Sequence, residues 1–469
     1  MPIVEFNLLK RGIVFRRLVP TILIIYVLSS VCAKAGQSDK SSVFQPDFEV
    51  CSTDVTATEE GRLRIEKARY ERTITALQAT AKSPRHDSNE ASPGKNELRR
   101  TQSNLLRVLE RLECKHLSEL SDPVVRGPSA PKVNFIELEV HYATDRLANP
   151  DKTQIPNRDP GKDFSGTLDP DFKDFSYGTA KITIPTHRTP GELNLPRFWN
   201  FVSQSDPTRF FTIQQITDLS RKAFMQQMNS PGAKEESSLL LFVHGFDTTF
   251  ADAAFRAAQL AHDLQFPGKV MFYSWPSAGV ITGYWKDEDS SRISASRFQK
   301  LLADLLETKI DRIYIVSHSM GSRIVIPTVM ALASRGVDVS KLSELMLAAP
   351  DFNEIEFKDI AAAFRKLRAK GTRLTIYASS NDFALRASKV IHSYRRLGES
   401  DPALDVFPGL DSVDASTVAP LRRAFGHSYV YDCVQVIGDM EDIVLNGLSP
   451  KDRGLLAVPD KEFGWKFPK

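Results

Sequence analysis

The sequence predicts an α/β protein with a mostly parallel sheet, preceded by a separate helical segment. Two observations predict this fold class. From about residue 133, short runs rich in β-branched residues appear and later alternate with helical segments, which is typical of βαβ units. Before that point helical periodicity dominates, and the stretch "SDPVVRGPSAP" separates the two parts. We therefore expect an N-terminal signal at residues 1–35, a helical hairpin at 36–125 and an α/β domain at 126–469.

The first residues have the pattern of an export signal. Lys10, Arg11, Arg16 and Arg17 precede the apolar stretch "LVPTILIIYVLSSV", and the small-x-small sequence "AKA" follows it. The protein is therefore expected to be periplasmic or secreted. The alternative is an uncleaved inner-membrane anchor, although Pro20 interrupts a stretch that is short for a membrane span.

Net charge gives no support for a nucleic-acid partner. The predicted signal contains five basic groups and one acidic group, so its removal lowers the formal net charge by four, from +3 to about −1. A chain so close to neutral is not expected to bind nucleic acid or an anionic membrane through its overall charge.

The predicted hairpin consists of two amphipathic helices at 57–82 and 95–120, joined by the polar loop "SPRHDSNEASPG". Apolar residues recur on one stripe of each helix among charged residues. We expect the hairpin to pack on its own domain or on a second copy of the chain, so it is also a candidate surface for oligomerisation.

Cysteine usage excludes a disulfide framework, because the chain has only four cysteines. Cys32 lies in the predicted signal, and Cys51 and Cys114 flank the helices of the hairpin. A bridge between Cys51 and Cys114 is a hypothesis that depends on export, and the alternative is that both stay reduced. Cys433 would be the odd thiol, buried in the α/β domain. The cysteine and histidine spacings match no metal site, and no metal or other cofactor is expected.

The α/β domain is expected to contain eight strands. In chain order they are "FIELEVHYATD", "AKITIP", "FFTIQQI", "LLLFVHGF", "KVMFYSWP", "RIYIVSHS", "ELMLAAPD" and "RLTIYASSND". Helices are predicted at about 250–265, 293–308, 320–335 and 353–369. The first strands have no helices between them, so they are expected to join the sheet as antiparallel or irregular strands.

The stretch "IYIVSHSMGSRIV" is typical of a nucleophile elbow. Ser319 ends a predicted strand and begins a predicted helix, and its surroundings nearly match the pattern G-x-S-x-G. Positions two residues before and after the serine must be small, because strand and helix come close there. Gly321 meets this need fully and Ser317 partly. The alternative is an ordinary helix with a serine N-cap.

A nucleophilic serine needs a histidine base, and the base needs an acid that orients it. In α/β hydrolases these follow in the order Ser, acid, His, which leaves His392 and His427. His427 is preferred because Gly426 places it in a loop, whereas His392 is predicted on a helix. Asp382 is the preferred acid and Asp351 the alternative, since each follows a predicted strand at the edge where this fold keeps its chemistry. Asp382 could also be a helix N-cap.

The predicted reaction also needs two backbone N–H donors for an oxyanion. One is expected from Met320, directly after the serine, and the other from Phe246, in the loop after the strand "LLLFV". His244 is expected to brace this loop rather than to take part in catalysis.

These motifs together resemble a known family. "VHYATDR", "LLLFVHGFDTTFADAAFRAAQLAHDL", "VMFYSWPSAG", "IVSHSMGSRIV", "LAAPD", "YASSNDFAL" and "FGHSYV" occur here in order. They are similar to the α/β-hydrolase family called domain of unknown function 900, over about residues 133–440 and without the hairpin. The resemblance implies an α/β-hydrolase fold, an esterase- or lipase-like reaction and a triad of Ser319, Asp382 and His427. It assigns no substrate. We expect Asp145 and Arg146 of "YATDR" to form a structural ion pair or a strand-end cap.

The function expected from the sequence is that of a serine hydrolase that cleaves a carboxylic ester or related acyl bond in a small-molecule or lipid-like substrate. One alternative is a peptidase or amidase that uses the same triad. A second alternative, from a different class, is a non-catalytic binding protein that keeps the fold and uses the hairpin for interaction.

Overall fold

The structure is a computed structural model, and it describes most of the chain from residue 134 onward. The described ranges are 134–149, 160–195, 206–230, 237–279, 283–419 and 426–468. The predicted signal, the hairpin and the Cys51–Cys114 bridge lie outside these ranges. Cys433 is free and buried, as predicted.

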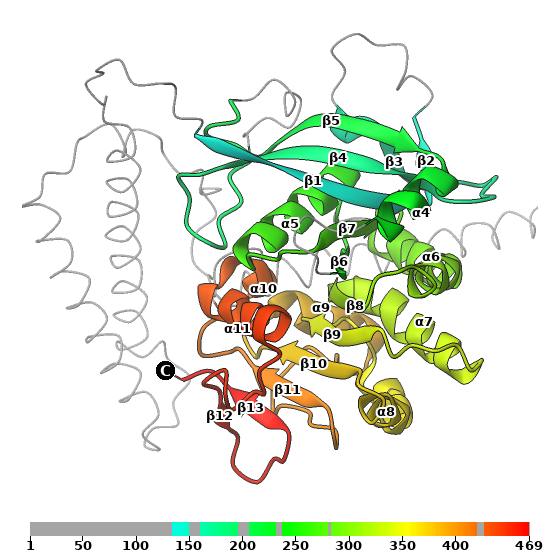
Figure 1. Cartoon of the computed structure of the whole chain (residues 1–469). Coiled ribbons are helices and arrows are strands. Elements are labelled where there is room, and N and C mark those ends of the chain that lie inside the picture. The colour runs from blue at the N-terminus through cyan, green and yellow to red at the C-terminus, as the bar shows by residue number, and fades with distance from the viewer. Residues whose placement is uncertain are drawn as a thin grey trace, which may run out of the picture. The chain divides into compact units, whose positions relative to one another are not determined.

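A single sheet of 11 strands forms the centre of the described chain, in the order β12-β13-β11-β10-β9-β8-β6-β7-β1-β4-β5 (Figure 1). The strands around the candidate site are β6 (Ser238–Val243), β7 (Lys269–Ser274), β8 (Arg312–His318), β9 (Leu342–Ala348) and β10 (Arg373–Ala378). All neighbouring pairs from β11 to β1 are parallel. The predicted mostly parallel sheet is therefore confirmed.

The first strands join this sheet in antiparallel fashion, which confirms the prediction for the part of the chain without helices. β1 (Phe135–Thr144) pairs with β4 (Ser176–Pro185), and β4 pairs with β5 (Thr212–Leu219). β1 is also parallel to β7, so it connects the antiparallel edge to the parallel centre. A separate two-stranded sheet contains β2 (Arg146–Ala148) and β3 (Phe164–Leu168).

Helices cover both faces of the sheet (Figure 1). On one face lie α5 (Phe250–Asp263), α10 (Tyr429–Asp432) and α11 (Val434–Asn446), and their buried side chains form one hydrophobic cluster with the sheet. On the other face lie α4 (Arg221–Asn229), α6 (Tyr284–Leu306), α7 (Ser322–Ser334) and α8 (Glu354–Arg368), with a second cluster. Among the described residues, no helix is long and apolar enough to cross a membrane.

The burial of the central strands explains why their sequences are continuously apolar. Every residue of β6, "SLLLFV", is buried, and so is nearly all of β8 and β9. A parallel strand between two helical layers has no polar face. Side-chain caps hold the starts of α4, α5, α8 and α9 (Phe383–His392), and Thr249 and Asp252 form a complete capping box at α5.

The structure corrects the predicted start of one helix. α6 begins at Tyr284, well before the predicted start at about 293. The reason is that the buried face of its first turns is polar: Asp287, Ser290, Ser291 and Ser294 are all buried. Hydrophobic periodicity cannot detect helical turns whose buried side chains are polar.

Several C-terminal elements are too short for a periodic signal and are not predicted from the sequence. They are β11 (Asp411–Asp414), β12 (Leu456–Ala457) and β13 (Gly464–Lys466). They extend the sheet beyond β10. After β10 the chain continues into α9 (Phe383–His392), whose N-cap is Asp382.

Candidate active site

Ser319 lies at a sharp turn between a strand and a helix, as the sequence predicts. β8 ends at His318, one turn of 3-10 helix covers Ser319–Gly321, and α7 begins at Ser322. The backbone of Ser319 is left-handed, with φ 51°. This conformation is strained for a residue with a Cβ and concentrates at functional sites. Ser319 therefore has the backbone geometry of a nucleophile elbow.

Two glycines permit the close packing around this turn. A Cβ at Gly321 would lie 2.5 Å from the carbonyl oxygen of His244 and 2.6 Å from that of Val243. A Cβ at Gly245 would lie 2.8 Å from the Cβ of Ser319. Side chains do not fit at such distances, so the two positions require glycine. The loop after β6 consequently lies directly beside the serine.

His427 and Asp382 form a hydrogen-bonded pair. His427 Nδ1 lies 2.7 Å from Asp382 Oδ2, and Asp382 Oδ1 accepts the backbone N–H of Leu385 at 3.0 Å. One oxygen of the carboxylate therefore caps α9 while the other binds the imidazole. Asp382 is both a helix N-cap and the partner of His427, two positions that the sequence presents as alternatives. Because Nδ1 donates to Asp382, the neutral ring leaves Nε2 free to accept a proton.

A glycine brings the loop of His427 to the end of β10. Gly426 is left-handed, with φ 72°, and a Cβ there would lie 2.2 Å from the carbonyl oxygen of Asn381. Asn381 directly precedes Asp382, so only glycine allows the approach that joins the base to the acid.

His318 connects this pair to the serine. The rings of His318 and His427 lie 4.6 Å apart, and His318 Nε2 donates to the backbone carbonyl of His427 at 3.1 Å. His318 directly precedes Ser319, so this contact holds the His427 loop against the elbow. Burial, followed by the charge of His427, holds the pKa of His318 well below its usual value. His318 is therefore neutral.

The surroundings of His427 favour its protonated form. Burial lowers its pKa, but the charge of Asp382 and the hydrogen bond to it, with a smaller contribution from Asp351, outweigh burial and raise the pKa above its usual value. A buried imidazolium next to a carboxylate is the species that a general base must become when it takes a proton.

His244 and Arg146 brace the loop that contains Phe246. His244 is buried, its ring stacks on Trp275 at 5.0 Å, and its Nδ1 donates to the carbonyl of Gly245 at 2.8 Å. Burial and the charge of Arg146 hold the pKa of His244 well below its usual value. This geometry agrees with the structural role expected for His244.

The expected structural ion pair does not form between Asp145 and Arg146, because Asp145 pairs with Arg297 at 3.4 Å and Arg146 binds other partners. The Arg146 guanidinium is buried and donates to carbonyl oxygens, among them those of Ser277 at 2.9 Å and Thr248 at 2.8 Å. Asp145 instead accepts from the hydroxyl of Tyr273 at 2.9 Å. Arg146 thus ties the loop after β6 to the chain after β7.

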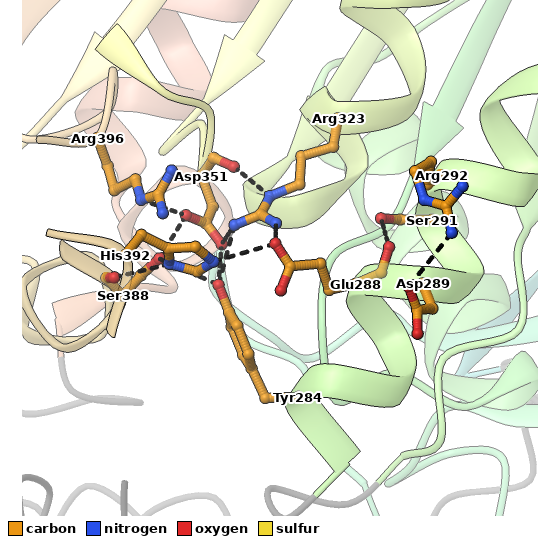
Figure 2. A network of polar contacts seen from close by, with 10 residues as sticks. All are labelled: Tyr284, Glu288, Asp289, Ser291, Arg292, Arg323, Asp351, Ser388, His392 and Arg396. Carbon is orange, nitrogen blue, oxygen red and sulfur yellow. Dashed lines mark hydrogen bonds and ion pairs between the residues drawn. The ribbon is translucent and has the colours of Figure 1, made fainter. Parts of the chain in front are cut away.

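Asp351 and His392, the alternative acid and base, belong to a different network (Figure 2). Asp351 binds two arginines, and Arg323 Nη2 lies 3.1 Å from its Oδ2. His392 Nδ1 lies 2.9 Å from the Ser388 carbonyl, and its Nε2 lies 3.0 Å from Glu288 Oε1. The geometry therefore joins Asp382, and not Asp351, to His427.

Sequence reasoning does not identify Tyr284 and Arg323 as members of this network. One signal could have revealed Arg323: a cation in the first turn of a helix opposes the helix dipole and needs a specific anion. The structure supplies Glu288 at 2.5 Å and Asp351 at 3.1 Å. Tyr284 gives no such signal, because an aromatic residue at a helix start usually belongs to the core.

The solved structures that resemble this chain include two of the type II thioesterase YbtT from the yersiniabactin biosynthetic pathway, one of them an alanine mutant. Each is 16% identical to this chain, with a TM-score of 0.22. The matches cover 44% and 45% of this chain and 97% and 98% of the thioesterase chains. Likeness at this level carries no information about the reaction of this protein. No curated protein matches the chain.

Comparison with family models is specific. The model described as an α/β hydrolase of unknown function, domain of unknown function 900, matches residues 220–431. The matched range includes Phe246, Ser319, Asp351, Asp382 and His427. The α/β-hydrolase fold expected from the sequence is confirmed, and the expected resemblance to this family is confirmed over residues 220–431.

Proposed function

We propose that this hydrolase uses Ser319 as nucleophile, His427 as base and Asp382 as the acid that orients the base. The observation that supports the proposal most is the 2.7 Å contact between His427 Nδ1 and Asp382 Oδ2, in a loop that contacts His318, the residue before the left-handed Ser319. Such a constellation is recognised by geometry and roles, and it performs acyl transfer on several unrelated folds.

The proposed reaction has two steps. Ser319 Oγ attacks the carbonyl carbon of a carboxylic ester while His427 Nε2 takes the hydroxyl proton, and His427 then gives this proton to the leaving alkoxide. Water, deprotonated by His427, attacks the acyl-enzyme; the proton returns to Ser319 Oγ, and the carboxylic acid leaves. Met320 and Phe246 N–H groups would bind the oxyanion in both steps. The proposed substrate is a small-molecule or lipid-like acyl compound.

A nucleophile substitution tests this proposal. Ser319→Ala should abolish hydrolysis of a short-chain aryl ester, with a loss of about 10⁶-fold in kcat, because a nucleophile knock-out costs roughly as much as removing a whole triad. Ser322→Ala is the matched control, since it changes a buried serine of the same helix start that has no proposed role. Turnover retained by Ser319→Ala would overturn the assignment.

Labelling with a fluorophosphonate separates the enzyme from a non-catalytic binding protein. The wild-type chain should be labelled at Ser319, and absence of labelling would favour the binding protein. A panel of matched esters and amides then separates an esterase from an amidase or peptidase.

A further inference from the structure

Asp351 is the centre of a buried polar network beside the candidate site (Figure 2). Tyr284 donates to its Oδ2 at 2.9 Å and Ser388 to its Oδ1 at 2.7 Å. Arg323 and Arg396 lie 3.1 and 3.2 Å from the same carboxylate. Its partners thus come from α6, α7, α9 and the chain after α9, although Asp351 itself follows β9.

The backbone of Asp351 contacts the elbow. Its N–H donates to the carbonyl oxygen of Ser319 at 3.1 Å. This carbonyl belongs to the same peptide group as the N–H of Met320, the first proposed oxyanion donor. A trans peptide is planar, so its carbonyl and its N–H point in opposite directions. Holding the Ser319 carbonyl on Asp351 therefore fixes the direction of the Met320 N–H.

The carboxylate of Asp351 reaches the second proposed donor through Tyr284. The Tyr284 hydroxyl binds Asp351, and the ring of Tyr284 packs edge-to-face on Phe246, with centroids 5.2 Å apart and an angle of 65°. Phe246 directly follows Gly245, which lies so close to Ser319 that a Cβ at Gly245 would be 2.8 Å from the Ser319 Cβ. Tyr284 is buried, so its ring limits the movement of Phe246 away from the elbow.

Arg323 makes this connection rigid. Its Nε donates to the backbone carbonyl of Asp351 at 2.8 Å, and its Nη2 donates to the Tyr284 hydroxyl at 3.0 Å. Burial would raise the pKa of Asp351, but Arg323 and Arg396, with hydrogen bonds from Ser388 and Tyr284, hold it well below its usual range. The Asp351 carboxylate is therefore ionised near neutral pH.

We propose that Asp351 is a positioning residue that aligns the two oxyanion donors with each other: its N–H fixes the Ser319–Met320 peptide and its carboxylate fixes Tyr284 against Phe246. This inference rests on the proposed function. It gives Asp351 a role in catalysis that is distinct from the triad acid, because the residue acts through Met320 and Phe246 and does not touch the base.

Two substitutions of Tyr284 test the link to Phe246. Tyr284→Phe removes the hydroxyl and keeps the ring, and should lower kcat for a short-chain aryl ester by about 10-fold with little change in KM. Tyr284→Leu also removes the ring contact and should approach the loss of about 10² to 10³-fold in kcat that follows deletion of one oxyanion donor. The loss should fall on kcat because the donors bind the oxyanion and not the ground-state carbonyl.

A distant tyrosine provides the matched control. Tyr142 on β1 is also buried and donates to a carboxylate, Asp218 Oδ1, at 2.8 Å. Tyr142→Phe should lower the melting temperature about as much as Tyr284→Phe and leave kcat unchanged. Equal losses of kcat in both variants would overturn the proposal, because they would show a general effect of weaker packing.

Asp351→Asn tests the centre of the network and should lower kcat by about 10 to 10²-fold. In the double variant with Tyr284→Phe the loss should be smaller than the product of the single losses, because both changes act on the same contact between Tyr284 and residue 351. If Asp351→Asn does not fold, Ser388→Ala, which removes one hydrogen bond to the carboxylate, should still lower kcat a few-fold.

The rate of fluorophosphonate labelling at Ser319 distinguishes failure of this inference from failure of the proposed function. The Tyr284 and Asp351 variants should be labelled more slowly than wild type, in proportion to their kcat. Wild-type labelling rates and kcat in all folded network variants would overturn the positioning role and leave the triad intact. No labelling of the wild-type protein at Ser319 would overturn both.

Discussion

Two aspartates that follow neighbouring strands of the sheet have opposite surroundings. Asp382 follows β10 and Asp351 follows β9, and the two strands are parallel neighbours. Both side chains are buried. Asp382 binds one imidazole and one backbone N–H. Asp351 lies between the guanidinium groups of two arginines.

The difference shows why strand position alone cannot assign the triad acid. The charge of Asp351 is balanced at all times, because arginine stays protonated. The described residues provide no lysine or arginine ion pair for Asp382, whose ionic partner is His427. Asp382 therefore gains most of its Coulomb energy when His427 takes a proton, which is the moment at which a general base needs it. A carboxylate that is permanently paired with arginine, such as Asp351, is better suited to a structural role.

The largest expected effect in this comparison is on turnover. Asp382→Asn should lower kcat by about 10⁴-fold, since an amide can hold the histidine in the wrong tautomer and cannot stabilise the imidazolium. Asp351→Asn should lower kcat by no more than about 10²-fold, which is on the order of the loss from one misaligned oxyanion donor. Steady-state kinetics with one aryl ester compare the two variants. If Asp351→Asn is the more damaging change, the acid lies one strand earlier than proposed.

The same pair of variants should have the reverse order in stability. Asp351→Asn leaves two buried guanidinium groups facing a neutral amide, and breaking a buried ion pair costs about 3–5 kcal/mol. Above the raised pKa of His427, where the imidazole is neutral, Asp382→Asn should cost no more than about 1 kcal/mol, because asparagine is as good an N-cap for α9 as aspartate. Urea unfolding followed by tryptophan fluorescence measures both. Equal losses of stability would show that the arginines do not depend on Asp351.

The candidate triad can be proposed from the sequence because each of its members follows a local rule. Ser319 has a small-residue turn after an apolar strand, Asp382 follows a predicted strand, and His427 follows a glycine in a late loop. The network around Asp351 follows no local rule. Its members Tyr284, Arg323 and Arg396 come from separate segments, and the helix that contributes Tyr284 has a buried polar face which hides its start.

The smallest effect, and the sharpest separation of the two aspartates, is expected in the pH dependence of kcat/KM. His427 must be neutral to accept the serine proton, so activity should fall as pH drops through the raised pKa of His427 in the free enzyme. The midpoint of this acid limb should therefore lie above the ordinary histidine value of about 6.5.

Asp382 contributes more than Asp351 to raising the pKa of His427. Asp382→Asn should thus move the residual acid limb clearly to lower pH, and Asp351→Asn should move it in the same direction by a smaller amount. Tyr142→Phe, which changes no charge near His427, should leave the midpoint in place. A larger shift from Asp351→Asn than from Asp382→Asn would mean that Asp351 is the carboxylate to which His427 responds.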